Sequence, residues 1–154
     1  MDETKTWLDI RKEKGDKGES IVELYLENKF PDTEIEHIPI EEAYKGYDFK
    51  INDNYYEAKV LGDCNTIHMT INELQKAILY EDSYILSVVN IDKGSLHLIH
   101  NPVKTLELPP EYLISCKFTN NYCNIFIGTF KIYLKRLDAI SIKIDVKEYI
   151  NKIE

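Results

Sequence analysis

Residues 47–60 read Tyr-Asp-Phe-Lys-Ile-Asn-Asp-Asn-Tyr-Tyr-Glu-Ala-Lys-Val, which is two short apolar runs on either side of a polar turn. Aromatic and β-branched residues around an Asn/Asp turn predict a β-hairpin. Side chains alternate between the faces of a strand, so Glu57 and Lys59 share one face of the second strand. Ala58 and Val60 lie on the other face, where they can contact a core.

The register of this hairpin decides whether its charged residues meet. A two-residue loop at Asp53-Asn54 would place Asp48 opposite Lys59, on the same face as Glu57. A shift of one residue would move Asp48 to the other face, because the side-chain repeat of a strand is two residues. We therefore expect two carboxylates and a lysine to converge only if the turn has the right length.

Asp48, Glu57 and Lys59 are the residue types that a metal-dependent phosphodiesterase needs. Mg²⁺ usually takes one or two protein carboxylates together with water and substrate phosphate. Lysine can orient a metal-bound water or offset the charge that develops on phosphate. The alternative is an exposed hairpin face with ordinary ion pairs, since Glu-x-Lys also begins at Glu3 and Glu27.

Length and composition predict a single domain over residues 1–154. The chain is 44% hydrophobic and has only 6 Gly and 5 Pro. It has neither a continuous apolar run long enough for a membrane span nor a signal-peptide pattern at residues 1–5, so we expect a cytoplasmic protein that does not bind membranes. Three widely spaced cysteines without a Cys-x-x-Cys pair predict free thiols.

The formal net charge of −8 disfavours a protein that grips nucleic acid unaided, because phosphate binding draws on Lys and Arg. Cations outnumber acids only in residues 101–154. There Lys131, Lys135 and Arg136 are interleaved with apolar and aromatic residues, which makes them the candidate nucleic-acid-binding residues. The alternative is a strand with one solvated face.

Apolar periodicity predicts the order helix, three strands, helix, two strands and a β-rich extension. Glu19 borders the buried face of the first helix and could reach inward. A strand, helix, strand sequence implies a right-handed crossover. The expected helices cover residues 15–29, 70–81 and a short stretch from 145, and the expected strands lie within residues 33–40, 47–60, 83–91, 96–100, 112–118, 122–130 and 131–144.

The remaining polar candidates do not join the site. His68 lies on an apolar segment and is expected to be structural, and Gln75 is expected on a helix surface. His97 and His100 are three residues apart on one strand, so they should point to opposite faces and form no joint metal site.

The elements above carry five motifs in a fixed order. The motifs are Gly15-x-x-Gly18-Glu19, Gly46-Tyr47-Asp48-Phe49, Tyr56-Glu57-Ala58-Lys59-Val60, Thr70-Ile-Asn-Glu73-Leu74 and Tyr84-Ile-Leu86. Together they resemble the PD-(D/E)XK nuclease superfamily, most closely the NO VEIN C-terminal-type domain related to Mrr-like nucleases, over about residues 15–100. Tyr47 stands where the superfamily motif has its proline.

The resemblance implies an α/β (α+β) fold, with a restriction-endonuclease-like αβββαβ core over residues 15–100. A mixed central sheet flanked by helices would be followed by a β-rich extension with a short C-terminal helix over residues 101–154. Asp48, Glu57 and Lys59 match the catalytic triplet of such nucleases, and Glu19 matches an acidic residue of their first helix. Asp48, Glu57 and the Ala58 carbonyl would hold Mg²⁺ or Mn²⁺, with Glu19 ligating through water or supporting a second ion.

The leading hypothesis is therefore a Mg²⁺-dependent DNA endonuclease for restriction, repair or defence against foreign DNA. By the same resemblance, the products would be a 5′-phosphate and a 3′-hydroxyl. A homodimer, or a larger complex, would supply the DNA affinity that an acidic chain lacks. The rival hypothesis is a nuclease-like fold kept as a non-catalytic interaction subunit of a larger complex.

Overall fold

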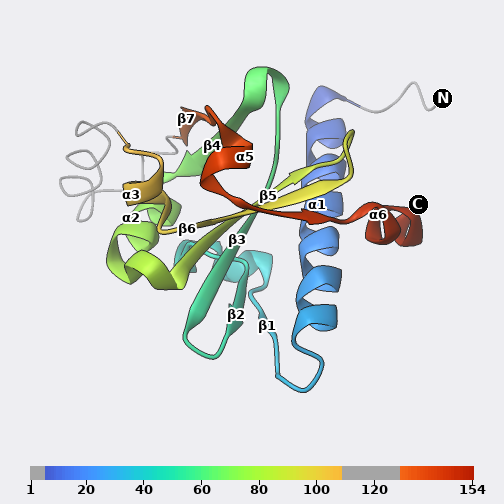
Figure 1. Ribbon diagram of the computed structural model, residues 1–154, viewed down its shortest axis with the longest axis horizontal. Coiled ribbons are helices and arrows are strands. Elements are labelled where there is room, and N and C mark those ends of the chain that lie inside the picture. The colour runs from blue at the N-terminus through green and yellow to red at the C-terminus, as the bar shows by residue number, and fades with distance from the viewer. Residues whose placement is uncertain (1–5, 109–128) are drawn as a thin grey trace.

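The computed structural model describes residues 6–108 and 129–154 and has a mixed α+β fold (Figure 1). Its main sheet has six strands in the order β1-β2-β3-β5-β6-β8, and β4 pairs with β7 in a second sheet. The strands are β1 (Glu36–His37), β2 (Phe49–Ile51), β3 (Asn54–Val60), β4 (Thr66–Thr70), β5 (Tyr84–Asn90), β6 (Ser95–His100), β7 (Thr129–Tyr133) and β8 (Ile142–Asp145). The α-helices are α1 (Trp7–Lys29), α2 (Ile71–Tyr80), α3 (Pro102–Thr105), α5 (Leu137–Ile140) and α6 (Lys147–Ile153).

Helices cover both faces of the main sheet. One hydrophobic cluster joins α1 and α6 to one face, and includes Ile21 and Ile150. The other joins α2 and the β4–β7 ribbon to the opposite face, and includes Leu74 and Ile132. Strand β5 supplies side chains to both clusters, which explains why its sequence is almost continuously apolar. The expected mixed sheet flanked by helices is confirmed.

The central crossover follows the predicted pattern. Strands β3 and β5 are parallel neighbours, and the chain between them forms β4 and α2. Helix α2 begins after Thr70, whose side chain accepts from the Glu73 backbone N–H while the Glu73 carboxylate accepts from Thr70 N. This is the capping box that the sequence predicts. The antiparallel pairing of β5 with β6 is also as expected.

The predicted hairpin register is wrong by two residues. Phe49 pairs with Tyr56 and Ile51 with Asn54, so the loop is Asn52-Asp53 instead of Asp53-Asn54. Asn52 adopts a left-handed φ of 53°, a conformation that Asn tolerates better than most residues. Because the shift is an even number of residues, the faces of the strand are unchanged. Asp48, Glu57 and Lys59 therefore still share one face of the hairpin.

The N-terminal elements differ more from expectation. Helix α1 begins at Trp7 instead of residue 15, because Thr6 and Asp9 form a capping box and Gly15 does not interrupt the helix. The strand predicted within residues 33–40 shortens to β1, since Pro39 precedes a 3₁₀ helix, η1 (Ile40–Lys45). Strand β4 was not predicted, because its pairing partner β7 lies far along the chain.

The strand predicted over residues 131–144 is divided in three. Strand β7 ends at Tyr133, Arg136 takes a left-handed φ of 56° ahead of α5, and β8 then pairs with β6 in the main sheet. The short C-terminal helix is present as α6. The strand predicted over residues 112–118 lies outside the described residues, and so does the strand predicted over residues 122–130 as far as residue 128. Its last two residues belong to β7. None of the helices in residues 6–108 and 129–154 combines the length and apolarity needed to cross a membrane.

Candidate functional site

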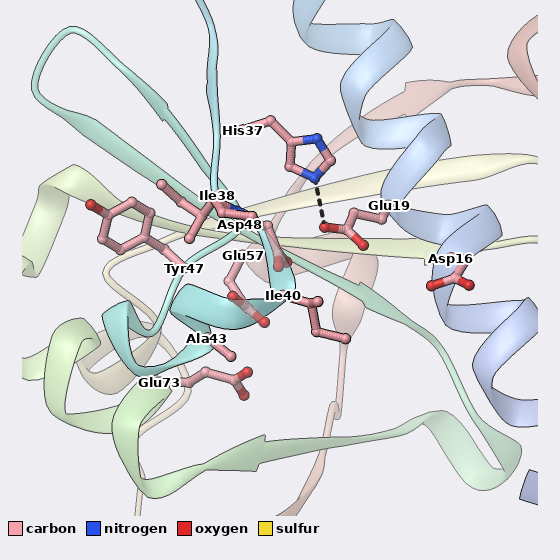
Figure 2. Close-up of a pocket in the computed structure, with 11 residues that line it drawn as sticks. Asp16, Glu19, His37, Ile38, Ile40, Ala43, Tyr47, Asp48, Glu57 and Glu73 are labelled. Carbon is pink, nitrogen blue, oxygen red and sulfur yellow. Dashed lines mark hydrogen bonds and ion pairs between the residues drawn. The ribbon is translucent and has the colours of Figure 1, made fainter.

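Acidic side chains from three parts of the chain line one cavity of about 400 Å³ (Figure 2). Helix α1 contributes two of them, the β2–β3 hairpin two more, and α2 one. His37, apolar residues of the β1–η1 segment and Tyr47 line the rest of the wall. The lining residues are Asp16, Glu19, His37, Ile38, Pro39, Ile40, Ala43, Tyr47, Asp48, Glu57 and Glu73.

The cavity lies at the end of the β2–β3 pairing, where the two strands diverge. The paired residues of the two strands end at Phe49 and Tyr56. Beyond them, the Asp48 side chain continues the contact, because its Oδ2 accepts the Ala58 backbone N–H at 2.8 Å. One carboxylate oxygen thus satisfies the backbone of β3 and leaves the other for a ligand.

Lys59 lies between the carboxylate of Glu57, on the same face of β3, and the carboxylate of Glu73 on α2. Its Nζ is 2.8 Å from Glu73 Oε1 and 3.4 Å from Glu57 Oε1. Burial opposes the charged form of Lys59, but attraction by Glu57 and Glu73 outweighs it and raises the lysine pKa. The two carboxylates therefore favour the charged form of Lys59, which suits it to stabilise negative charge on a ligand.

Asp48 and Glu57 have unusually high pKa values. Burial raises the pKa of Asp48 to about 6, against the Ala58 N–H, which lowers it. Glu57 is only 4% exposed, and burial together with repulsion from Glu73 and Asp48 holds its pKa well above the usual range. Burial also disfavours the charge on Glu73, but Lys59 and hydrogen bonds keep its pKa below normal. One lysine therefore does not balance the three acids, and an added cation would relieve their repulsion.

Glu19 reaches the cavity because α1 packs tightly on β3. A Cβ at Gly18 would overlap Val60 Cγ2, so only glycine permits this approach. His37 on β1 holds the Glu19 carboxylate, with Nε2 3.0 Å from Glu19 Oε1 and Nδ1 3.1 Å from Glu23 Oε2. The ring of His37 also stacks on Phe49 at 4.7 Å, which fixes its position.

The donor set fits a hard divalent cation. Within residues 6–108 and 129–154, no three His, Cys, Asp or Glu side chains already form a complete metal-ligand group. Mg²⁺ does not need one, because it keeps several waters and takes one or two carboxylates. Asp48 and Glu57 would be those carboxylates. The Ala58 carbonyl stays a predicted ligand.

The structure brings four predicted residues together, namely Glu19, Asp48, Glu57 and Lys59. Lys131, on β7, and the following Lys135 and Arg136 do not line the cavity. Sequence reasoning missed the contributions of Asp16, His37 and Glu73. The capping box identified Glu73 only as a helix-start residue, and nothing local indicated that its carboxylate would reach Lys59. His37 had no signal, because its partners Glu19, Glu23 and Phe49 are all more than ten residues away in the sequence.

A comparison of the sequence with protein families finds a match that includes residues of this site. The family model described as Protein NO VEIN, C-terminal, matches residues 18–100, which is more than half of the chain. The chain belongs to this family. NO VEIN C-terminal domains are associated with the PD-(D/E)XK nuclease-like fold. The matched region runs from within α1 to the end of β6 and holds Glu19, Asp48, Glu57, Lys59 and Glu73. A comparison with curated proteins finds no match, and neither does one with solved structures.

Proposed function

We propose that this NO VEIN C-terminal-type domain is a Mg²⁺-dependent nucleic-acid phosphodiesterase, a DNA endonuclease of the PD-(D/E)XK type. The observation that carries the proposal is that Asp48 and Glu57 line one cavity while Lys59 contacts the Glu57 and Glu73 carboxylates, with too little positive charge to balance the acids. An isolated ion-paired surface would keep such carboxylates in water and leave their pKa values low.

Each residue has a role in this chemistry. Asp48 and Glu57 would hold the cation, which would supply an activated water and stabilise charge on the phosphate. Lys59 stays protonated and stabilises negative charge on the phosphate oxygens. Glu19, fixed by His37, extends the acidic wall toward a water-mediated contact or a second ion. Restriction, repair and defence against foreign DNA are the settings proposed for this activity.

The net charge of −8 supports a second candidate, a non-catalytic interaction subunit of a larger complex. In that case the acidic cluster would serve only to position a partner. An intermediate possibility keeps the catalytic site and obtains DNA affinity from a homodimer or a partner chain.

A cleavage assay separates these candidates. Plasmid and single-stranded DNA are incubated with Mg²⁺ or Mn²⁺ and with wild type, Asp48→Asn or Lys59→Ala. We expect each substitution to lower the cleavage rate by about 10²-fold or more. Asp53→Asn and Lys93→Ala are matched controls, because both residues are exposed and neither lines the cavity.

Two outcomes would overturn the assignment. Equal cleavage by wild type and both site variants would show that the cavity is not catalytic. Failure of wild type to cleave any substrate with either metal, alone or as a dimer, would favour the interaction subunit.

A further inference from the structure

Three tyrosine rings pack against one another beside the cavity. The rings of Tyr55, on β3, and Tyr80, at the end of α2, are stacked in parallel with their centres 3.7 Å apart. Tyr47 makes T-shaped contacts with both, its ring centre lying 4.8 Å from that of Tyr55 and 6.3 Å from that of Tyr80. The side chain of Tyr47 also lines the cavity. These contacts join the three rings, which we call the tyrosine cluster, directly to the acidic site.

The backbone next to Tyr47 is held from two sides. The hydroxyl of Tyr84, which is fully buried on β5, donates a hydrogen bond to the Gly46 carbonyl at 2.8 Å. Gly46 has a left-handed φ of 75°, and a Cβ there would lie 2.6 Å from both the Asn72 carbonyl oxygen and Lys76 Cγ of α2. Tyr47 is therefore fixed before a ligand arrives, so stacking on its ring costs little conformational entropy.

The two sides of the cavity differ in charge. Figure 2 shows Tyr47 on one side and Asp16 and Glu19 of α1 on the other. The tyrosine side carries a cation, since Lys50 Nζ lies 5.5 Å from the centre of the Tyr55 ring. Acids repel phosphate and lysine attracts it. A nucleic-acid strand is therefore expected to reach the cavity over the tyrosine cluster.

The tyrosine cluster keeps surface for a ligand. Its three rings pack on the hydrophobic cluster that includes Leu74, but each is only half-buried and meets solvent elsewhere. Tyrosine rings of this kind are platforms on which nucleobases stack. In a duplex the bases stack on each other, so the rings would have no partner. The ligand that fits is therefore an unpaired base.

We infer that the tyrosine cluster is a nucleobase subsite, in which an unpaired base of the substrate strand stacks on Tyr47 while Lys50 contacts a neighbouring phosphate. The inference rests on the proposed nuclease function and names its substrate class, a strand that is unpaired at the cavity. Stacking tolerates every base, because every base has an aromatic face. The subsite therefore positions the phosphate next to the stacked base at the carboxylates without reading its sequence.

Oligonucleotide binding by the full chain tests the subsite. An end-labelled oligothymidylate of about 20 nucleotides is titrated in EDTA, so that cleavage cannot occur, and its fluorescence anisotropy is followed. An oligomer of equal length that lacks the bases keeps the phosphates and should bind about tenfold more weakly, because it cannot stack. A duplex of equal length should also bind about tenfold more weakly. Oligouridylate in a parallel titration distinguishes RNA from DNA as the source of the strand.

Substitutions test whether the tyrosine cluster makes the contact. Tyr47→Leu should weaken oligothymidylate binding about tenfold and abolish the difference from the base-free oligomer, whereas Tyr47→Phe keeps the ring and should lose much less. Lys50→Glu should weaken binding and lower the salt-dependence slope by about 0.7.

Tyr149→Leu and Lys152→Glu are the matched controls and should bind like wild type. Tyr149 is half-buried on α6, and Lys152 Nζ lies 5.8 Å from the centre of its ring. Thermal unfolding checks that every variant folds. Should Tyr47→Leu not fold, the comparison of oligothymidylate with the base-free oligomer on wild type still decides.

The possible failures can be told apart. The inference is overturned if wild type binds no oligonucleotide, if it binds the base-free oligomer or the duplex as tightly as oligothymidylate, or if Tyr47→Leu binds like Tyr149→Leu. Binding as expected without cleavage in Mg²⁺ would reject the nuclease proposal and leave the subsite standing. Cleavage by wild type that Tyr47→Leu does not change would reject the subsite and leave the nuclease proposal standing.

Discussion

Asp48 combines a structural contact with a place in the site. Its Oδ2 accepts the Ala58 N–H where the backbone pairing of β2 and β3 ends. The same burial that secures this contact raises its pKa to about 6. The residue therefore holds the strand edge in shape while keeping a carboxylate that is costly to ionise without a cation.

Because ionising the buried Asp48 costs free energy, we predict that Asp48→Asn stabilises the fold by an amount that depends on pH. The folded pKa lies above the unfolded value, so the stability contributed by protonated Asp48 is complete below pH 4 and is lost as pH rises through about 6. Asparagine stays neutral and keeps an oxygen for the Ala58 N–H. We expect the variant to gain about 1–3 kcal/mol over wild type at pH 7.5 and almost nothing at pH 4. Urea unfolding at both pH values measures this, and the exposed Asp53→Asn should change neither.

The raised pKa values of Asp48 and Glu57 predict how the Mg²⁺ concentration needed for cleavage depends on pH. A carboxylate must lose its proton to bind Mg²⁺, so protons compete with the cation below the raised pKa values of Asp48 and Glu57. The Mg²⁺ concentration for half-maximal cleavage should fall several-fold as pH rises from 5.5 to 7.5. Metal titrations of the cleavage rate at four pH values test this. A constant half-maximal concentration would remove both carboxylates from the metal site.

At the scale of elements, substitutions in α1 can test how closely this helix packs on β3. Gly18→Ala should destabilise the protein by about 1–3 kcal/mol, because the new methyl overlaps Val60 and α1 must shift. Gly15→Ala, in the same helix with nothing within 4 Å, should instead stabilise by about 0.5–1 kcal/mol. Chemical denaturation compares the two. Adding Val60→Ala to Gly18→Ala should restore part of the loss, and no restoration would argue against this contact.

A substitution in α2 can test whether the capping residue Glu73 is also needed for cleavage. In Glu73→Gln the amide oxygen can still accept from Thr70 N, but the ion pair with Lys59 is lost. Cleavage should fall by about 10–100-fold while the circular dichroism spectrum is unchanged, because an uncompensated Lys59 loses its orientation. Asp9→Asn changes the equivalent position of the α1 capping box, which is exposed. That control should cleave like wild type, and a matching loss in both variants would contradict the proposed link.

At the scale of the whole molecule, the main sheet extends beyond the matched family region. Strand β8 pairs with β6, and Val146 and Ile150 complete the cluster beneath α1. Residues 141–154 therefore supply one edge of the sheet and part of the core. Their charge and sequence gave no indication that they pack against the first helix.

Truncation tests this dependence. A chain ending at Ile140 loses β8 and α6, and exposes apolar side chains worth about 1.5–3 kcal/mol each when buried. That loss is comparable to the whole stability of a typical domain, so we expect no cooperative thermal transition. A chain ending at Asn151 removes only three residues, each exposed or half-buried, and should unfold cooperatively. Cooperative unfolding of the shorter chain would show that residues 6–140 fold alone.

The fold could be predicted best where its signals are local. The apolar stripe of α1 after Gly18, the Thr70 capping box and the apolar run of β5 all depend on neighbours a few residues away. The shared face of Glu57 and Lys59 followed from strand alternation alone. The register of the hairpin did not, because it depended on the left-handed conformation of Asn52.

The sequence by itself determined that Asp48, Glu57 and Lys59 can share one face of a hairpin and that Glu19 borders the buried face of the first helix. Local periodicity, capping and turn residues carry that information. Only the tertiary structure brought Glu73 and His37 to the cavity and joined β8 to the sheet. Those relations join residues far apart in the chain, and they depend on how whole elements pack. The raised pKa values have the same origin, because burial is a property of the assembled fold.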